Sequence, residues 1–264
     1  MLKHRLIPVL FLKDGFLVRS ESFRIHQNLG NPIAQVERYN AWDVDELIYI
    51  DISESDSYST KRTDIGEKAG GAANVTELIS IVASRCFMPL TFGGRIRTLE
   101  DAHARFSLGA DKITLNTIAI DDPEFITAAA HRFGSQAIVI SMDVKLLHDN
   151  SYEVYTDRGR RPTGWSPASW AREVERHGAG EILLNSIDRD GKAEGYDLDL
   201  VRSVVEAVNI PVITCGGAGE YSDFGRVILE AGASAAAAGN IFHFKELAYP
   251  IAKRQLKKAQ LNFR

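Results

Sequence analysis

The segments FGGRIRTLEDAHARFSLGA (residues 92–110) and CGGAGEYSDFGRVILEAGA (residues 215–233) share one pattern at a constant offset of 123 residues. Each begins near a pair of glycines, continues through a helix-like stretch and ends in Gly-Ala. A second pair of segments, DELI at 45–48 and GEIL at 180–183, corresponds at an offset of 135 residues. Self-similarity of this kind indicates two related halves that close into a ring.

Short apolar runs recur along the chain, with helical patterns between them. Runs that are apolar on both faces and alternate with helices are typical of parallel strands joined by crossover helices. The expected strands are Ile7–Leu12, Leu47–Ile52, Met88–Phe92, Lys112–Leu115, Ala137–Met142, Glu181–Ile187, Pro211–Thr214 and Ala235–Ile241. The alternation alone also fits a doubly wound sheet. Together with the repeat, it predicts an α/β fold, a (β/α)8 TIM barrel with a two-fold internal repeat, as one domain over residues 1–264.

The two offsets, 123 and 135, differ by 12 residues, so the first half carries an insertion. The polar, Gly/Ala-rich stretch at residues 63–74 is the natural place for it, as a loop after the second strand. Loops that follow the strands of such a barrel lie on its catalytic face. This loop could be a lid or a substrate contact, or it could be only a spacer.

Composition excludes several classes of function. The net charge of −4 gives no basic field for nucleic acid, and 45% hydrophobic residues is the balance of a globular protein. No apolar run reaches the roughly 18–20 residues that cross a bilayer, and the N-terminus does not read as a signal peptide. We therefore expect a cytoplasmic protein that binds neither nucleic acid nor membrane. Cys86 and Cys215 show no metal-ligand spacing, so no metal site is expected, and no cofactor either.

Glycine-rich sequence lies at the ends of several expected strands. Phosphate binding needs backbone N–H groups that converge on one place with little side-chain bulk. The pairs Gly93-Gly94, Asn116-Thr117, Gly216-Gly217 and Gly239-Asn240 lie at such ends. A single Gly-Gly pair is more often only a turn. Two pairs related by the internal repeat predict two phosphate sites on opposite sides of one mouth.

Two aspartates, Asp51 and Asp143, sit where apolar strands stop. Burial beside the mouth would raise the pKa of either carboxylate toward the range useful for acid–base work. The alternative is an aspartate that only holds a neighbouring loop, and we expect function at Asp143. After the sixth strand, Asp188-Arg189-Asp190-Gly191 could grip a ribose hydroxyl or brace the loop.

At these residues the sequence resembles, over nearly its whole length, the family of cyclase subunits of imidazole glycerol phosphate synthase, commonly called HisF. The resemblance rests on Leu12-Lys13-Asp14-Gly15, Asp45-Glu46-Leu47, Phe133-Gly134-Ser135-Gln136, Gly178-Ala179-Gly180-Glu181-Ile182-Leu183-Leu184, Asp188-Arg189-Asp190-Gly191, Gly216-Gly217-Ala218-Gly219 and Phe242-His243-Phe244. Members of this lyase family are (β/α)8 barrels that pair as heterodimers with a glutaminase. Its ammonia enters at the N-terminal face and travels through the barrel. The resemblance thus implies a glutaminase partner and a phosphorylated or nucleotide-linked substrate.

Functional positions of the family carry over onto this chain. The charged gate for ammonia falls on Arg5, Glu46, Lys112 and Glu181. The substrate and phosphate contacts fall on Asp51, Gly94, Asn116, Thr117, Asn185, Gly191, Gly217, Gly239 and Asn240. The four gate charges could also be ordinary ion pairs at strand starts. Charges inside a barrel are costly unless they are paired or functional, which favours the gate.

The chain departs from the family pattern at three positions. The family usually has Thr where Asn185 stands and Ser where Asn240 stands, so the central pocket and one phosphate grip are expected to be reshaped. Phe11 occupies the position of an essential catalytic aspartate, whereas the second catalytic aspartate is matched by Asp143. Loss of a positioned acid or base typically costs about 10²–10⁴-fold in rate, so the resemblance puts cyclase activity in doubt.

One branch of the family resembles the chain more closely. In these barrels, encoded with surface-polysaccharide genes, an apolar residue replaces that aspartate, and Cys86-Phe87-Met88-Pro89 and Phe106-Ser107-Leu108-Gly109 also look like that branch. With a glutaminase and a separate amidotransferase, they are implicated in making acetamidino sugars. We therefore expect an ammonia-handling subunit for sugar amidination. The alternatives are the histidine-biosynthesis cyclase, which converts a phosphoribulosyl bisphosphate intermediate to imidazole glycerol phosphate and AICAR, and a non-catalytic scaffold that activates its glutaminase.

Overall fold

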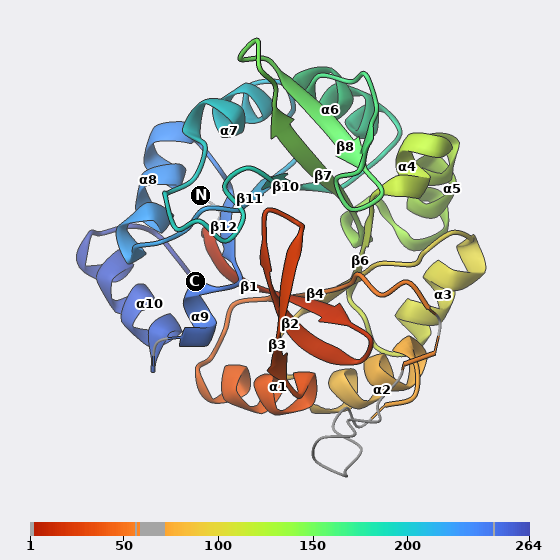
Figure 1. Ribbon diagram of the computed structural model, residues 1–264, viewed down its shortest axis with the longest axis horizontal. Coiled ribbons are helices and arrows are strands. Elements are labelled where there is room, and N and C mark those ends of the chain that lie inside the picture. Colours follow the sequence, from red (N-terminus) through yellow and green to blue (C-terminus); the bar gives the residue numbers. More distant parts are fainter. Residues whose placement is uncertain (1–2, 56, 59–71, 245) are drawn as a thin grey trace.

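Eight parallel strands form a closed barrel with helices arranged around it (Figure 1). The computed structural model describes residues 3–55, 57, 58, 72–244 and 246–264. In order around the barrel, the strands are β1 (Arg5–Lys13), β4 (Leu47–Asp51), β5 (Leu90–Gly93), β6 (Lys112–Leu115), β7 (Ile138–Leu146), β10 (Glu181–Ser186), β11 (Val212–Cys215) and β12 (Ala235–Ala238). Parallel pairing of β12 with β1 and of β7 with β10 completes the ring. The predicted (β/α)8 barrel is confirmed, and the doubly wound sheet is excluded.

All eight barrel strands overlap the apolar runs that predicted them. The largest shortening is in the last strand, where β12 stops at Ala238 and Ile241 already begins a helix. The internal repeat is visible as two matching units: residues 92–110 form the end of β5 and a helix, and residues 215–233 form the end of β11 and a helix. The repeated sequence therefore encodes a repeated strand-loop-helix unit.

Helices surround the barrel and bury their apolar sides against it. They are α1 (Pro32–Ala41), α2 (Val75–Arg85), α3 (Leu99–Ser107), α4 (Thr117–Asp121), α5 (Glu124–Phe133), α6 (Pro167–Arg176), α7 (Leu198–Val205), α8 (Tyr221–Ala231), α9 (Ile241–Phe244) and α10 (Ala248–Lys258), with a 3-10 turn at Ser135–Ala137. Local sequence fixes several starts: Asn31 caps α1 ahead of Pro32, and Thr98 forms a capping box with Asp101 at α3. In the described residues, no helix is long and apolar enough to cross a membrane.

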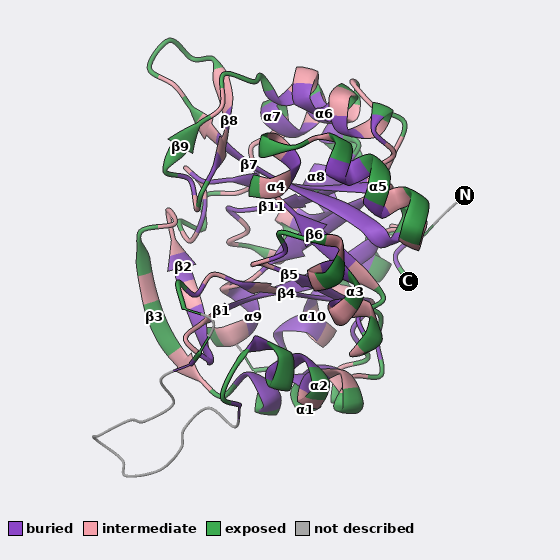
Figure 2. Ribbon diagram, turned by 90° about the vertical axis from the view of Figure 1, so that its right-hand side faces the viewer, coloured by how far each residue is buried: buried purple, intermediate pink, exposed green. Residues whose placement is uncertain are grey.

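Two antiparallel hairpins, which the sequence analysis did not predict, extend the barrel strands. One consists of β2 (Phe16–Glu21) and β3 (Ile25–Gly30), and the other of β8 (Tyr152–Thr156) and β9 (Arg161–Pro162). Both lie at the end of the barrel opposite the two termini, as Figure 2 shows. The first crosses the barrel mouth in Figure 1. They pair with the ends of β1 and β7, so the hairpins flank the mouth at which the parallel strands finish.

The middle of the barrel is apolar. Inward-facing side chains from the strands form a cluster separate from the larger core between strands and helices. Its buried members are Ile7, Val9, Phe11, Val18, Ile48, Val139, Leu183, Ile213, Cys215, Ala235 and Ala237. The polar groups inside the barrel are therefore concentrated at its two ends.

The predicted insertion at residues 63–74 falls mostly outside the described residues, which resume at residue 72. The described flanks lie side by side, because the Tyr58 N–H donates to the Ala73 carbonyl at 2.8 Å. Asn74 then caps α2 by accepting from the Glu77 N–H. The described residues on the two sides of this segment, Tyr58 and Ala73, are thus joined beside the barrel mouth.

Candidate active site

Two neighbouring pockets open at the C-terminal ends of the barrel strands. The larger pocket, of about 440 Å³, lies at the ends of β4, β5, β6, β7 and β10. The smaller pocket, of about 230 Å³, lies at the ends of β11 and β12 beside residues 190–193. Phe11 at the end of β1 lines both, so it stands between them.

The residues to which the resemblance assigned substrate and phosphate contacts, together with Asp143, all line one of these pockets, whereas Gly93, Asp188 and Arg189 line neither. The larger pocket holds Asp51, Gly94, Asn116, Thr117, Asp143 and Asn185. The smaller pocket holds Gly191, Gly217, Gly239 and Asn240. The two glycine-rich groups therefore lie in separate hollows of one mouth, in the two halves of the repeat.

Glycine is required at Gly94 and Gly217 by backbone packing as well as by the open space in front of them. Both have positive φ angles, +93° and +108°. A Cβ at Gly94 would overlap the carbonyl of Asp51, and a Cβ at Gly217 would overlap the carbonyl of Gly195. The glycine signal in the sequence thus reports close packing of neighbouring loops in addition to room for a ligand.

Arginines give the larger pocket a positive rim. Arg95, Arg97 and Arg158 line it, opposed by the carboxylates of Asp121 and Asp157. Arg95 and Arg158 both donate to the Ser53 carbonyl, at 3.1 and 3.0 Å. The smaller pocket is lined mainly by glycine and alanine. An anionic group in the larger pocket would meet side-chain cations, whereas in the smaller pocket it would meet mostly backbone.

Asp143 is a buried carboxylate in the wall of the larger pocket. It is 6% exposed and accepts a hydrogen bond from the Asn116 side-chain amide at 2.7 Å. Burial raises the pKa of Asp143 to about 7, and the charge of Asp190 adds to the rise, while hydrogen bonds from Asn116 and Ser141 oppose it. A carboxyl group with a pKa near 7 can both accept and donate a proton at neutral pH.

Asp51 is also buried in the larger pocket, but its oxygens are already engaged. Oδ1 accepts from the Ser53 N–H at 2.9 Å and from its hydroxyl at 2.5 Å, and Oδ2 accepts from the Tyr58 hydroxyl at 3.1 Å. Burial raises the pKa of Asp51, and these hydrogen bonds partly offset the rise. Asp51 therefore holds the loop after β4 and contributes to the pocket wall.

Phe11 places an aromatic ring at the position where the resemblance implied a catalytic aspartate. Its ring packs edge-to-face against Phe23 at the tip of the first hairpin, with centroids 6.4 Å apart. Phe23 also lines the larger pocket. The aromatic pair makes the boundary between the two pockets apolar.

Contacts that sequence reasoning missed hold the first hairpin over the mouth. Asp190 Oδ2 accepts from the Ser20 hydroxyl at 2.6 Å and from the Phe23 N–H at 3.3 Å. The Asn240 amide donates to the Ser20 carbonyl at 3.0 Å. Of the two interpretations of the acidic motif after the sixth strand, these contacts match bracing. No local sequence signal joins residues 20 and 190, which meet only through the barrel.

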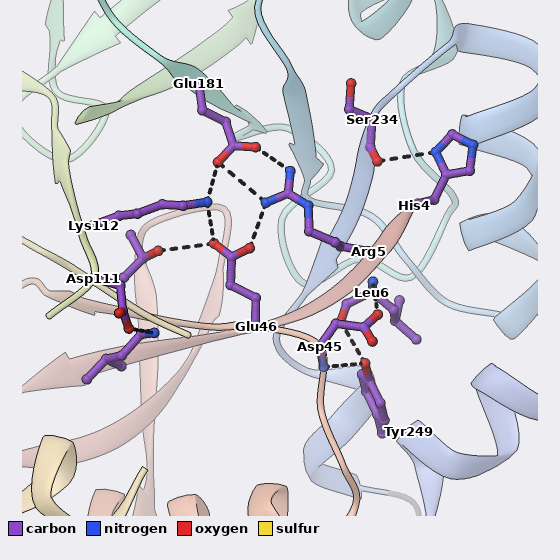
Figure 3. Close-up of polar contacts among 12 residues, drawn as sticks. His4, Arg5, Leu6, Asp45, Glu46, Asp111, Lys112, Glu181, Ser234 and Tyr249 are labelled. Atoms are coloured by element: carbon purple, nitrogen blue, oxygen red, sulfur yellow. Dashed lines mark hydrogen bonds and ion pairs between the residues drawn. The ribbon is translucent and has the colours of Figure 1, made fainter. Parts of the chain in front are cut away.

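The four predicted gate residues meet in one ring at the opposite end of the barrel (Figure 3). Arg5 donates to Glu46 at 2.6 Å and to Glu181, while Lys112 donates to Glu46 at 3.0 Å and to Glu181 at 2.9 Å. The Thr91 hydroxyl also donates to Glu46. Burial would raise the pKa of Glu46, but Arg5 and Lys112 hold it below its usual value. Each carboxylate thus bridges both cations, and the ring is closed and charge-balanced.

The fold and the mouth define a class of protein. In (β/α)8 barrels, catalytic residues sit at the C-terminal ends of the strands. Here that end combines a buried carboxyl group of near-neutral pKa with two pockets. The chain is built as a (β/α)8-barrel enzyme.

Comparison with known proteins gives the family. Residues 5–248 match the family model described as histidine biosynthesis protein, and the chain belongs to this family. It is 42% identical over 259 residues to the imidazole glycerol phosphate synthase subunit HisF of Hyphomonas neptunium, covering 98% of this chain and 97% of that one. It is 40% identical to the subunit of the same name from Alkaliphilus metalliredigens, over the full length of both.

A third relative, from Vibrio vulnificus, is named putative imidazole glycerol phosphate synthase subunit hisF2. It is 42% identical over 264 residues, and the match covers 100% of this chain and 92% of that protein. The chain is thus a HisF-type barrel related to lyase subunits. None of these three names refers to a glycan or to amidination, so the expected sugar-amidination branch gains no support from them.

Proposed function

We propose that this chain is the ammonia-using cyclase subunit of an imidazole glycerol phosphate synthase, acting on the phosphoribulosyl bisphosphate intermediate of histidine biosynthesis. The observation that carries the proposal is the position of Asp143, a carboxyl group with a pKa of about 7 beside two pockets. A substrate with a phosphate at each end suits two separate hollows of one mouth. The names of the relatives favour this reaction over sugar amidination.

Under this proposal, the residues of the two pockets bind the phosphates and Asp143 transfers protons. One phosphate would lie in the larger pocket near Gly94, Asn116 and Thr117, where arginines form part of the rim. The other would lie against the glycine-rich lining of the smaller pocket. Cyclisation to an imidazole requires protons to move to and from several nitrogens, and Asp143 is placed to carry them.

Ammonia would reach the mouth from the opposite end. The closed ring of Arg5, Glu46, Lys112 and Glu181 lies at the strand starts, and the interior above it is apolar. A glutaminase docked at that end would release ammonia next to the ring. Exchange of partners among the four charges would open a path while each charge stays compensated.

The presence of Phe11 favours a second candidate function, which is amidination of a surface-glycan sugar with a separate amidotransferase. Phe11 replaces a proton-transfer group with an apolar ring that packs on Phe23. In the cyclase, Asp143 must then act without the second aspartate, and we expect slow turnover. In an amidating barrel, the apolar boundary would serve a different acceptor.

The experiment that separates these functions measures turnover of the bisphosphate intermediate with ammonium chloride as the nitrogen source. We expect measurable but slow product formation by the wild type and an increase of about 10²-fold in kcat for Phe11→Asp, because the substitution restores a proton-transfer group at the mouth. Phe11→Leu is the matched control, since it keeps an apolar side chain and should give no gain.

Wild-type kcat on the order of 1 s⁻¹ or more would contradict the role assigned to Phe11. Product from none of the three proteins would reject the cyclase and leave amidination or a scaffold. A scaffold would still stimulate its glutaminase, and this stimulation distinguishes it from an enzyme that acts on another acceptor.

A further inference from the structure

Asn185 lies at the centre of the mouth, on the strand that leads there from the charged ring. On β10, Glu181, Leu183 and Asn185 are alternate residues and share the inward face of the barrel. Asn185 is paired in register with Asp143 on β7 and with Cys215 on β11. Its side chain is 3% exposed and lines the larger pocket. It is therefore buried next to the carboxyl group proposed to carry protons.

The side-chain oxygen of Asn185 is buried without a hydrogen-bond partner among the described residues. An unmade hydrogen bond on a buried acceptor is expensive, and native proteins leave few of them. Gly216 leaves space beside this oxygen, because a Cβ at that position would lie 3.0 Å from Asn185 Oδ1. Asp143 differs, because Asn116 already donates to it. The mouth thus contains a buried acceptor that still needs a donor.

The path from the ring to Asn185 runs beside mostly apolar side chains. Along β10 the residue between Glu181 and Asn185 is Leu183, and the inward side chains Val139 and Ile213 on the neighbouring strands are apolar. The polar exception is Ser141, which is paired in register with Leu183 and already hydrogen-bonds Asp143 at the mouth. Ammonia is a hydrogen-bond donor small enough for a narrow apolar passage. A molecule that passed the ring along this strand would meet Asn185 Oδ1 as a buried acceptor without a partner.

We propose that Asn185 Oδ1 is the acceptor that receives ammonia at the top of the barrel and holds it beside Asp143. This inference rests on the proposed use of ammonia by this barrel and names the residue that positions it. Threonine, the residue of the family at this position, also offers an oxygen acceptor, but on a shorter side chain. The longer amide brings the acceptor further into the mouth, where Phe11 supplies no polar atom.

The kinetic test varies ammonium chloride with the full-length chain and its Asn185→Leu and Asn185→Thr variants. Leucine has a similar size without an acceptor, and threonine is the matched control that keeps one. We expect Asn185→Leu to raise the KM for ammonia about tenfold, a larger factor than any change in the KM for the bisphosphate, and Asn185→Thr to retain most ammonia affinity. A rise in the KM for the bisphosphate alone would overturn the proposal, because Asn185 would then contact the carbon substrate.

If the wild type turns over no bisphosphate, the proposed function is rejected. Binding of ammonia to Asn185 can then still be measured directly by nuclear magnetic resonance. The side-chain amide resonances of Asn185 in ¹⁵N-labelled protein are assigned by their loss in Asn185→Leu. Titration at pH 8.5 with ammonium chloride should shift them progressively, whereas sodium chloride at equal ionic strength should not. Identical responses to the two salts would overturn the proposal and assign the oxygen to water or to substrate.

Discussion

Replacing Asp143 by asparagine is expected to lower kcat by about 10²–10⁴-fold, because the amide cannot accept or donate the proton that the carboxyl group carries. The matched control is Asp51→Asn, which changes the other buried aspartate of the larger pocket. Asp51 already accepts from Ser53 and Tyr58, so its loss should reduce stability more than chemistry. Steady-state kinetics of the two variants decide between them, and equal losses of kcat would contradict the special role of Asp143.

The free energy of unfolding should decrease as pH rises from 4 to 7, because of the buried carboxyl group of Asp143. Burial raises the pKa of Asp143 from 3.8 to about 7 in the folded state, so folding disfavours its ionised form. The penalty is absent below pH 4, grows as pH rises and is complete above pH 7, where it amounts to about 4 kcal/mol. Asp143→Asn should therefore be stabilised relative to the wild type at pH 8 more than at pH 5. Urea unfolding at the two pH values measures this difference.

Removal of Arg5 from the charged ring should lower the free energy of unfolding by about 3–5 kcal/mol, because Arg5→Met leaves two buried carboxylates with only Lys112 between them. Lys112→Met should cost less, since the Lys112 side chain is 21% exposed and that of Arg5 is 11% exposed. The double variant Arg5→Met, Glu181→Gln should recover most of the loss, because it leaves one balanced pair, Lys112 with Glu46. Chemical denaturation compares them, and an Arg5→Met loss below about 1 kcal/mol would show that the ring is not a coupled unit.

The sequence predicts the barrel well because its strands are buried on both faces. Runs such as Ile7–Leu12 have no polar face to confuse with a helix, and the repeat limits how the strands can be ordered. The hairpins escaped prediction for the opposite reason. In β3, Ile25 is 51% exposed and most other residues are polar, so its structure depends on pairing with β2 rather than on an apolar pattern.

The candidate site was predictable where its residues are marked by the local sequence. Glycine pairs and strand-end aspartates are visible in the sequence, and the resemblance placed the ring charges. Contacts between distant residues were not visible, as with Ser20 and Asp190, 170 positions apart. The unpartnered oxygen of Asn185 is likewise a property of packing, since Gly216 and Cys215 surround it only after β11 pairs with β10.

The proposed function requires ammonia to cross the barrel from the ring to the mouth. The most direct measurement supplies the chain and its glutaminase with glutamine labelled by ¹⁵N at the side-chain amide, in the presence of excess unlabelled ammonium chloride, and determines the isotope in the product by mass spectrometry. A barrel that conducts ammonia should give product whose new nitrogen is mainly ¹⁵N. Product with the isotope ratio of the bulk ammonium would contradict passage through the barrel.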